Sequence, residues 1–157
     1  MPINQNIKEA LKIIHEKLSK NNIKWALAGT TNMQLQGMQV EPHDLDIVIQ
    51  HKDLQKVSEL FSDYSASAVK ELRVLSGNRA LEVKAVIEKL EVQFFGGDEN
   101  DIYVNNLLSG KILKIKLDIN EIPCFTLEAE SQVYIETKRK QKADLIQEFL
   151  NKNRMHK

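Results

Sequence analysis

The sequence predicts an α/β (α+β) fold in which helices flank a mixed β-sheet. A helical pattern leads into an apolar, strand-like segment that ends at Gly29, and a β-branched, strand-like segment follows Asp44. Several further strand-like segments then precede a final helical pattern. Helices and strands that each have one apolar side bury that side by stacking into layers. A chain of 157 residues has the size of one domain, so we expect residues 1–157 to form a single domain.

The first predicted helix has one apolar stripe and an opposite charged side. Apolar residues that recur every three or four positions lie on one face of a helix. Asn21 and Asn22 end this pattern, and the mostly apolar residues 23–28 predict the first strand, which stops at Gly29. The stripe consists of Ile7, Leu11, Ile14 and Leu18.

A short helix is predicted directly after Gly29. Thr30 or Thr31 is a suitable N-cap, because a threonine hydroxyl can accept a hydrogen bond from the free N–H groups of a first helical turn. We therefore predict a helix over residues 32–35, which Gly37 ends.

The second predicted strand begins with two carboxylates. Residues 44–50 are predicted as a strand because their centre is β-branched, and Pro42 disfavours helix just before them. Asp44 and Asp46 are two positions apart, so both side chains point to one face, with backbones roughly 6–7 Å apart. Carboxylates this close repel unless a cation lies between them, and Mg²⁺ prefers such oxygen ligands. A glycine turn that opens a helix nearby favours phosphate, which suggests chemistry on a nucleoside triphosphate.

The remaining segments are predicted as alternating helices and strands. Asp53 and Thr126 are candidate N-caps of two further helices, the second with a break within the charged residues 136–142. Residues 98–106 are predicted to form a loop. The predicted strands are 69–70, 81–86, 90–95, 112–119 and the short extended piece 122–125, with a turn at 76–78.

The charge balance and the single cysteine exclude several classes of protein. The 22 basic and 22 acidic residues give a formal net charge of zero, which is unlike a dedicated nucleic-acid-binding protein. Cys124 is the only cysteine, so the chain has no internal disulfide and no cysteine-based zinc site. A reducing, cytoplasmic location fits best. No apolar run approaches the ~18 residues of a membrane span, so no membrane association is expected.

The order of these motifs resembles the signature of the polymerase-β-like nucleotidyltransferase superfamily. Its minimal members pair Gly-Gly or Gly-Ser with a later Asp-x-Asp, and here Gly29-Thr30 is followed by Asp44-x-Asp46. Pro42 and the flanking helices fall where that fold has them. The resemblance covers most of residues 6–150 and implies a single nucleotidyltransferase-like domain of the small prokaryotic type. The closing segment of such members is similar at Ile122-Pro123, Leu127-Glu128, Tyr134, Arg139 and Lys142.

The resemblance implies a metal-dependent nucleotidyl transfer. A nucleoside monophosphate would pass from an NTP, such as ATP, to an acceptor hydroxyl, and pyrophosphate would be released. Asp44 and Asp46 would bind Mg²⁺ (or Mn²⁺). Acceptors in the superfamily include antibiotics, proteins and RNA, so the acceptor stays open, and a homodimer or a helical protein partner could help to recognise it. The implied nucleotide-binding residues are Gly29, Thr30, Thr31 and Arg139.

The third carboxylate of the superfamily is replaced in this chain. It lies on a later strand, just before a glycine, and the corresponding piece, Val92-Gln93-Phe94-Phe95-Gly96, carries Gln93. An amide offers an oxygen without a charge, so this loss would weaken catalysis rather than the fold. Glu91 lies two residues earlier on the same face, and it joins Asp44 and Asp46 as a candidate catalytic residue.

Each of these assignments has an alternative. The two aspartates could be a solvated strand start, and residues 29–31 a plain strand-to-helix turn. Glu91 could be an exposed residue paired with a lysine, and the basic run 138–142 is by default a solvated helix face, with Arg139 as the exception. The functional alternative is a catalytically weakened or inactive module that binds nucleotide or acts as an antitoxin-like regulatory partner. A third possibility is a small α/β domain with an incidental motif.

Overall fold

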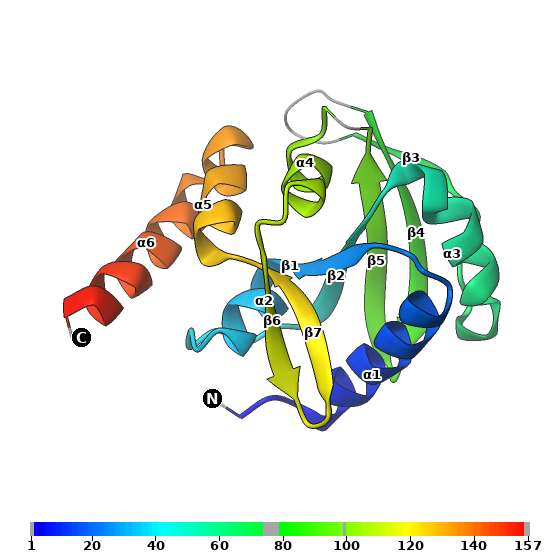
Figure 1. Cartoon of the computed structure of the whole chain (residues 1–157), viewed down its shortest axis with the longest axis horizontal. Coiled ribbons are helices and arrows are strands. Elements are labelled where there is room, and N and C mark those ends of the chain that lie inside the picture. The colour runs from blue at the N-terminus through cyan, green and yellow to red at the C-terminus, as the bar shows by residue number, and fades with distance from the viewer. Residues whose placement is uncertain (1, 74–78, 99, 156–157) are drawn as a thin grey trace.

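A mixed seven-stranded sheet forms the centre of the molecule, with strand order β3-β4-β5-β2-β1-β7-β6 (Figure 1). The computed structural model describes residues 2–73, 79–98 and 100–155; the turn predicted at 76–78 lies outside them. Strand β2 is parallel to β5 and β1 is parallel to β7, whereas the other neighbouring strands are antiparallel. The predicted mixed sheet with flanking helices is therefore confirmed.

The elements follow the predicted order closely. The strands are β1 (Trp25–Ala28), β2 (Asp44–Ile49), β3 (Lys70–Arg73), β4 (Arg79–Ile87), β5 (Leu90–Gly97), β6 (Ile112–Leu117) and β7 (Asn120–Phe125). The helices are α1 (Gln5–Lys20), α2 (Gly29–Leu35), α3 (Leu54–Leu60), α4 (Ile102–Leu108), α5 (Leu127–Glu136) and α6 (Lys140–Met155), with the 3₁₀ turns η1 (His51–Asp53) and η2 (Ser62–Tyr64).

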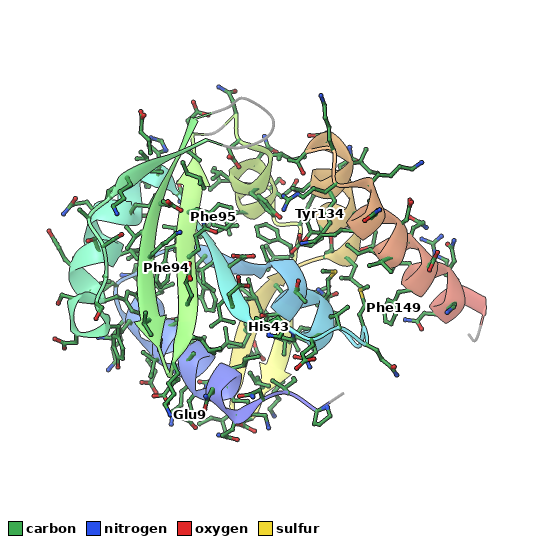
Figure 2. The ribbon with its side chains drawn as sticks, turned by 180° about the vertical axis from the view of Figure 1, so that it is seen from behind. Glu9, His43, Phe94, Phe95, Tyr134 and Phe149 are labelled. Carbon is green, nitrogen blue, oxygen red and sulfur yellow. The ribbon has the colours of Figure 1, made fainter. Side chains whose placement is uncertain are left out.

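The two faces of the sheet have different roles. One face carries Leu45, Ile47 and Ile49 and packs on α1 and α3 in the main core. The opposite face carries Val48 and meets α4 and α5 in a smaller cluster. Side chains alternate along a strand, so Phe94 and Phe95 lie on opposite faces (Figure 2). Asp44 and Asp46 share the face of Val48, on the side of α4 and α5.

The start of α2 differs from the prediction. The helix begins at Gly29, its N-cap is Ala28, and no side chain caps it. Thr31 is 1% exposed, and its hydroxyl donates to the backbone oxygen of Asp44 at 2.8 Å. The predicted threonine cap is therefore wrong, because this hydroxyl joins α2 to the start of β2 instead.

The loop predicted over residues 98–106 is also wrong, because α4 occupies much of it. Asp101 is its N-cap, and one carboxylate oxygen accepts from the backbone N–H groups of Tyr103 at 2.8 Å and Val104 at 3.1 Å. Both capped residues are buried against the sheet. The helix depends on this cap and on tertiary packing, since seven residues are too few for a stable isolated helix.

Removing the cap of α4 should lower stability measurably. We expect Asp101→Ala to reduce the free energy of unfolding by about 1 kcal/mol, because two helical N–H groups lose their acceptor. Asp101→Asn keeps an accepting oxygen and should retain most of that stability. Urea unfolding of the wild type and both variants gives the comparison. Equal losses in the two variants would contradict a capping role.

Candidate active site

The two predicted aspartates lie at the start of β2, next to the turn that opens α2. Asp46 pairs with Ala28 across β1 and β2, so its side chain comes up beside residue 29. Gly29 has a φ of +76°, and a Cβ built on it would lie 2.5 Å from Oδ2 of Asp46. Glycine is required at position 29 for two reasons: its φ is positive, and Asp46 fills the space that a Cβ atom would need. The aspartates and the α2 turn therefore share one side of the sheet.

The surroundings of Asp46 destabilise its charged form, so a cation nearby would be favourable. Burial and the neighbouring charge of Asp44 raise the pKa of Asp46 to about 6, while Lys142 and Arg139 act to lower it. A carboxylate whose charged form is destabilised in this way gains from any positive charge placed beside it. Asp44 is exposed and can present its oxygens to a shared ligand.

Arg139 reaches this site because of how α5 ends. Lys138 adopts a left-handed conformation, with φ of +62°, and its N–H donates to the oxygen of Ile135. The N–H of Arg139 donates to the oxygen of Tyr134 at 2.7 Å, which completes a Schellman motif. The Arg139 guanidinium then lies 4.8 Å from the centre of the Tyr134 ring. The predicted break within 136–142 is confirmed, because α5 ends at Glu136 and α6 begins at Lys140. The break places the Arg139 guanidinium over the Tyr134 ring.

Lys142 joins Arg139 through helical spacing. Residues three apart share a helix face, and the Lys142 ammonium lies 5.5 Å from the centre of the same Tyr134 ring. Tyr134 itself is buried beside α2 and α6 (Figure 2), and Met33 of α2 belongs to the same cluster. In the sequence analysis, Lys142 belongs to the basic run that is interpreted as a solvated helix face. The spacing from Arg139 was the signal that could have singled it out.

Glu130, a buried carboxylate that the sequence analysis did not identify, binds the Gly29 turn from the protein interior. Glu130 accepts hydrogen bonds from the Gly29 N–H at 2.7 Å, the Asn32 side-chain amide at 3.0 Å and the Tyr103 hydroxyl at 3.2 Å. Complete burial raises the pKa of Glu130 to about 7, and these hydrogen bonds oppose the rise. The available signal was its position, three residues after Leu127 on the buried stripe of α5.

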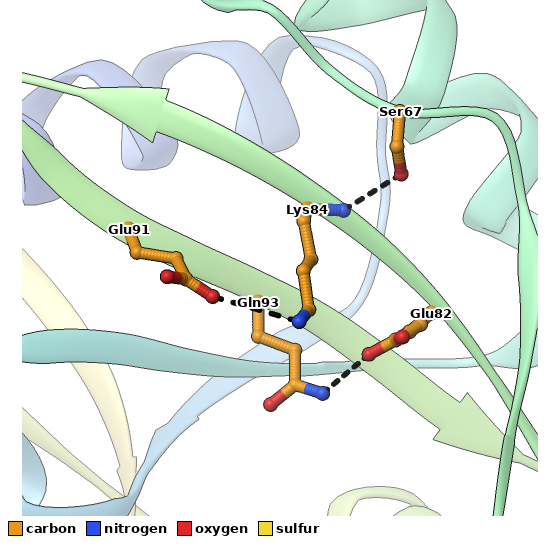
Figure 3. A network of polar contacts seen from close by, with 5 residues as sticks. All are labelled: Ser67, Glu82, Lys84, Glu91 and Gln93. Atoms are coloured by element: carbon orange, nitrogen blue, oxygen red, sulfur yellow. Dashed lines mark hydrogen bonds and ion pairs between the residues drawn. The ribbon is translucent and has the colours of Figure 1, made fainter.

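The register of β2 and β5 brings the third position of the site beside the aspartates. Asp44 pairs with Glu91 and Asp46 pairs with Gln93, so Gln93 lies next to Asp46, on the same face. Glu91 also forms an ion pair with Lys84 at 3.6 Å (Figure 3). Glu91 is therefore adjacent to Asp44, yet it has the lysine partner that the alternative interpretation expected.

The two threonines at the turn are not equivalent. Thr31 is buried, and its hydroxyl donates to the backbone oxygen of Asp44, so its side chain joins α2 to β2. Thr30 is half-buried and lies in the first turn of α2, where helical N–H groups have no partner within the helix. Thr30 is thus the better placed of the two to meet a phosphate.

The donor set fits a hard divalent cation that a nucleotide brings with it. Among the residues that the structure describes, no three His, Cys, Asp or Glu side chains form a ready-made metal centre. Asp44 and Asp46 supply two carboxylates, and Mg²⁺ is usually held by one or two carboxylates plus water and phosphate oxygens. The raised pKa of Asp46 agrees with this, because a bound cation would stabilise its charged form.

Comparison with known proteins identifies the family. A sequence model of the aminoglycoside-2''-adenylyltransferase family matches residues 10–147. The chain belongs to this family. Comparison with curated protein sequences found no match.

Solved structures agree on the fold. A protein from Thermotoga maritima described as a nucleotidyltransferase (TM1012) superposes with a TM-score of 0.73 at 22% identity, covering 96% of both chains. ANT(2'')-Ia, in complex with adenylyl-2''-tobramycin, gives a TM-score of 0.60 at 14% identity, covering 93% of this chain and 92% of that one. The lincosamide adenylyltransferase LnuA, bound to lincomycin, gives 0.55 at 16% identity, covering 93% and 99%. The fold is that of a small polymerase-β-like nucleotidyltransferase.

Replacing Gly29 should damage the site more than the fold. Gly29→Ala puts a Cβ against Asp46 and strains a positive φ, and we expect at least a tenfold weaker binding of Mn²⁺ and a non-hydrolysable ATP analogue. Gly110→Ala is the matched control, because Gly110 has a φ of +77° with nothing within 4 Å of its Cβ position. Both variants should lose about 1–2 kcal/mol from backbone strain, while only Gly29→Ala should lose binding in calorimetry. Equal binding by the two variants would contradict the contact.

Glu130 should make stability depend on pH. Its pKa rises from 4.5 to about 7 on folding, so between these values the unfolded chain loses the proton first and the wild type loses stability as the pH increases. Glu130→Gln does not titrate, and it can accept from Gly29 and Asn32 while donating to the Tyr103 oxygen. The stability of this variant relative to the wild type should therefore rise by about 3 kcal/mol between pH 4.5 and 7.

Urea unfolding across that pH range measures the difference. Glu128→Gln, an exposed change in the same helix, should follow the wild type throughout. A Glu130→Gln curve that stays parallel to the wild type would show that Glu130 does not carry the proton.

Proposed function

We propose that the protein is a Mg²⁺-dependent nucleotidyltransferase that moves a nucleoside monophosphate from an NTP to the hydroxyl of a small molecule. One observation carries this proposal: the Asp46 carboxylate adjoins the Gly29 turn, and the charges of Asp44, Lys142 and Arg139 all act on it. This arrangement supports the assignment of Asp44 and Asp46 as metal ligands, of the Gly29 turn as the phosphate-binding element and of Arg139 and Lys142 as countercharges for a triphosphate.

The reaction forms one phosphorus–oxygen bond and breaks another. The acceptor oxygen attacks the α-phosphorus, the bond from this phosphorus to the bridging oxygen of the β-phosphate breaks, and pyrophosphate leaves with both bonding electrons. The proton of the hydroxyl passes to solvent or to a carboxylate of the site. Mg²⁺ held by Asp44 and Asp46 would supply electrostatic stabilisation of the charge that develops on the phosphate oxygens.

The chain's own residues bind and orient the triphosphate. Gly29 lets the backbone approach the phosphates closely, and Thr30 offers N–H and hydroxyl donors beside it. Arg139 and Lys142 neutralise phosphate charge from the α5–α6 side. The Tyr134 ring supports both cations, which reduces the entropy lost when they fix a ligand. Positioning and charge compensation of this kind supply most of the catalysis in phosphoryl transfer.

A small-molecule acceptor agrees with the similar structures that were solved with a bound antibiotic or adenylylated antibiotic. Two of them are described with adenylyl-2''-tobramycin and with lincomycin, and this chain covers nearly all of their length. A cytoplasmic location, where NTP is available, agrees with the buried free thiol of Cys124. Among the helices that the structure describes, none combines the length and hydrophobicity that a membrane crossing requires. A homodimer or a helical protein partner stays a prediction.

A second candidate function is a nucleotide-binding module with weak or no turnover. Gln93 replaces the carboxylate expected beside Asp46, and the ion pair with Lys84 occupies Glu91. Without a third carboxylate the acceptor hydroxyl has no strong base and a second cation binds weakly. Such a module would bind Mg²⁺ and NTP as an antitoxin-like or regulatory protein.

Transfer and binding measured together test the proposal. We expect label from α-³²P-NTP to appear on hydroxyl-bearing antibiotics, such as tobramycin and lincomycin, or on small molecules of a cell extract, only when Mg²⁺ is present. Asp46→Asn should reduce this transfer and Mg²⁺-dependent ATP binding at least a hundredfold, because it removes a ligand charge. Asp63→Asn, an exposed change on η2, is the control and should match the wild type.

The outcomes separate the candidates. Binding that stabilises the protein, by about 2.7 kcal/mol at 100 times the dissociation constant, without transfer to any acceptor supports the second function. A melting temperature that does not respond to Mg²⁺ and any NTP would exclude both functions.

A further inference from the structure

Gln93 has a fixed orientation because of a carboxylate on the neighbouring strand. Its amide Nε2 donates to Oε2 of Glu82 at 2.6 Å (Figure 3). An ionised carboxylate has only acceptors, whereas a glutamine amide has a donating end and an accepting end. The NH₂ end of Gln93 must therefore face Glu82, and the amide oxygen must face the other way.

The sheet order decides what that oxygen faces. Strand β5 lies between β4 and β2, so a Gln93 amide whose nitrogen points to Glu82 on β4 turns its oxygen to the β2 side. There Asp46 is the register partner of Gln93. Figure 3 shows the two ends of the amide diverging in this way. The half-buried Gln93 thus presents an oxygen, and not a nitrogen, next to the carboxylate pair.

Glu91, the other candidate for the third position, has a different partner. Glu91 is the carboxylate nearest in sequence, but its ion pair with Lys84 draws it toward β4, and its side chain is 63% exposed. Lys84 is itself the cross-strand partner of Gln93. In this arrangement Glu91 balances Lys84, while Glu82 binds the amide. Gln93 is the β5 residue in register with Asp46, and the hydrogen bond to Glu82 engages only its amide nitrogen.

We propose that Gln93 serves as a neutral oxygen ligand at the third position of the metal-nucleotide site and that Glu82 is the positioning residue that keeps its oxygen turned to β2. This inference rests on the proposed function and explains how the site can operate without the third carboxylate. A neutral ligand holds a divalent cation less tightly than a charged one, so a second cation should bind more weakly than the first. Glu82 does not touch the cation in this scheme, and it acts only through the amide.

Inverting the amide tests the orientation directly. In Glu82→Lys the ammonium can only donate, so the Gln93 oxygen turns to β4 and its NH₂ group faces Asp46. We expect Mn²⁺ binding in the presence of a non-hydrolysable ATP analogue, measured by calorimetry and by electron paramagnetic resonance, to weaken at least tenfold for the second ion. Gln93→Leu, which removes the oxygen, should weaken it to a similar extent. Glu88→Lys, the same charge reversal in the exposed turn of the same hairpin, should stay within twofold of the wild type.

A double variant separates orientation from the electric field of the new charge. If Glu82 acts through the amide, Glu82→Lys made in the Gln93→Leu background should reduce the affinity for the second Mn²⁺ ion no more than Glu88→Lys does in that background. If Glu82→Lys reduces the affinity for the second Mn²⁺ ion equally in the wild type and in the Gln93→Leu background, its charge acts through space. That result would overturn the positioning role. Unchanged Mn²⁺ affinity in Gln93→Leu would overturn the ligand role.

The exchanged pair Glu82→Gln with Gln93→Glu offers a second check. It keeps the net charge and the cross-strand hydrogen bond but places the carboxylate next to Asp46, and it should bind the second Mn²⁺ at least tenfold more tightly than the wild type. Binding no tighter than in the wild type would contradict the inference. A wild type that binds neither Mn²⁺ nor the nucleotide would refute the proposed function instead, so the two failures are distinguishable.

Discussion

The close approach of Gly29 and Asp46 is the constraint on which the rest of the site depends. The chain leaves β1 and enters α2 without a spacer, at a residue with positive φ, and the Asp46 carboxylate fills the space that a side chain on residue 29 would need. The turn is held from the other side by Glu130, which binds the Gly29 N–H in the protein interior. The turn is thus fixed between one carboxylate that faces the site and one that is fully buried.

This arrangement costs stability. Burial raises the pKa values of both Asp46 and Glu130, so each opposes the compact state near neutral pH in its charged form. For Glu130 the surrounding hydrogen bonds offset part of that cost. For Asp46 the remaining compensation is positive charge, from Lys142 and Arg139 and from any cation that a nucleotide brings. Strained or destabilised groups that are concentrated in one place are typical of functional sites.

The β4–β5 hairpin gives this chain a different third position from the one that its superfamily leads one to expect. Gln93 retains an oxygen but no charge, and the carboxylates of Glu82 and Glu91 are engaged with Gln93 and Lys84. The hairpin therefore holds two negative charges close to the site, each with a hydrogen-bonding or ionic partner.

The sequence alone determined most of the order of elements, the paired aspartates and the glycine that ends the first strand. These features rest on spacing within a few residues: the apolar stripe of α1, the β-branched centre of β2 and the two-residue alternation that puts Asp44 and Asp46 on one face. The α4 helix was missed because its cap and buried contacts matter more than its short pattern. Thr31 was misassigned because its hydroxyl finds a backbone oxygen 13 positions away.

Only the tertiary structure decided which groups meet at the site. Glu130 and Gly29 are 101 positions apart, Glu82 binds Gln93 across a hairpin, and Lys142 reaches the site by way of a left-handed Lys138 that no local pattern required. Such contacts depend on strand order, register and the angle between helices. A one-dimensional pattern specifies which face a residue occupies, but it does not specify which distant residue faces it.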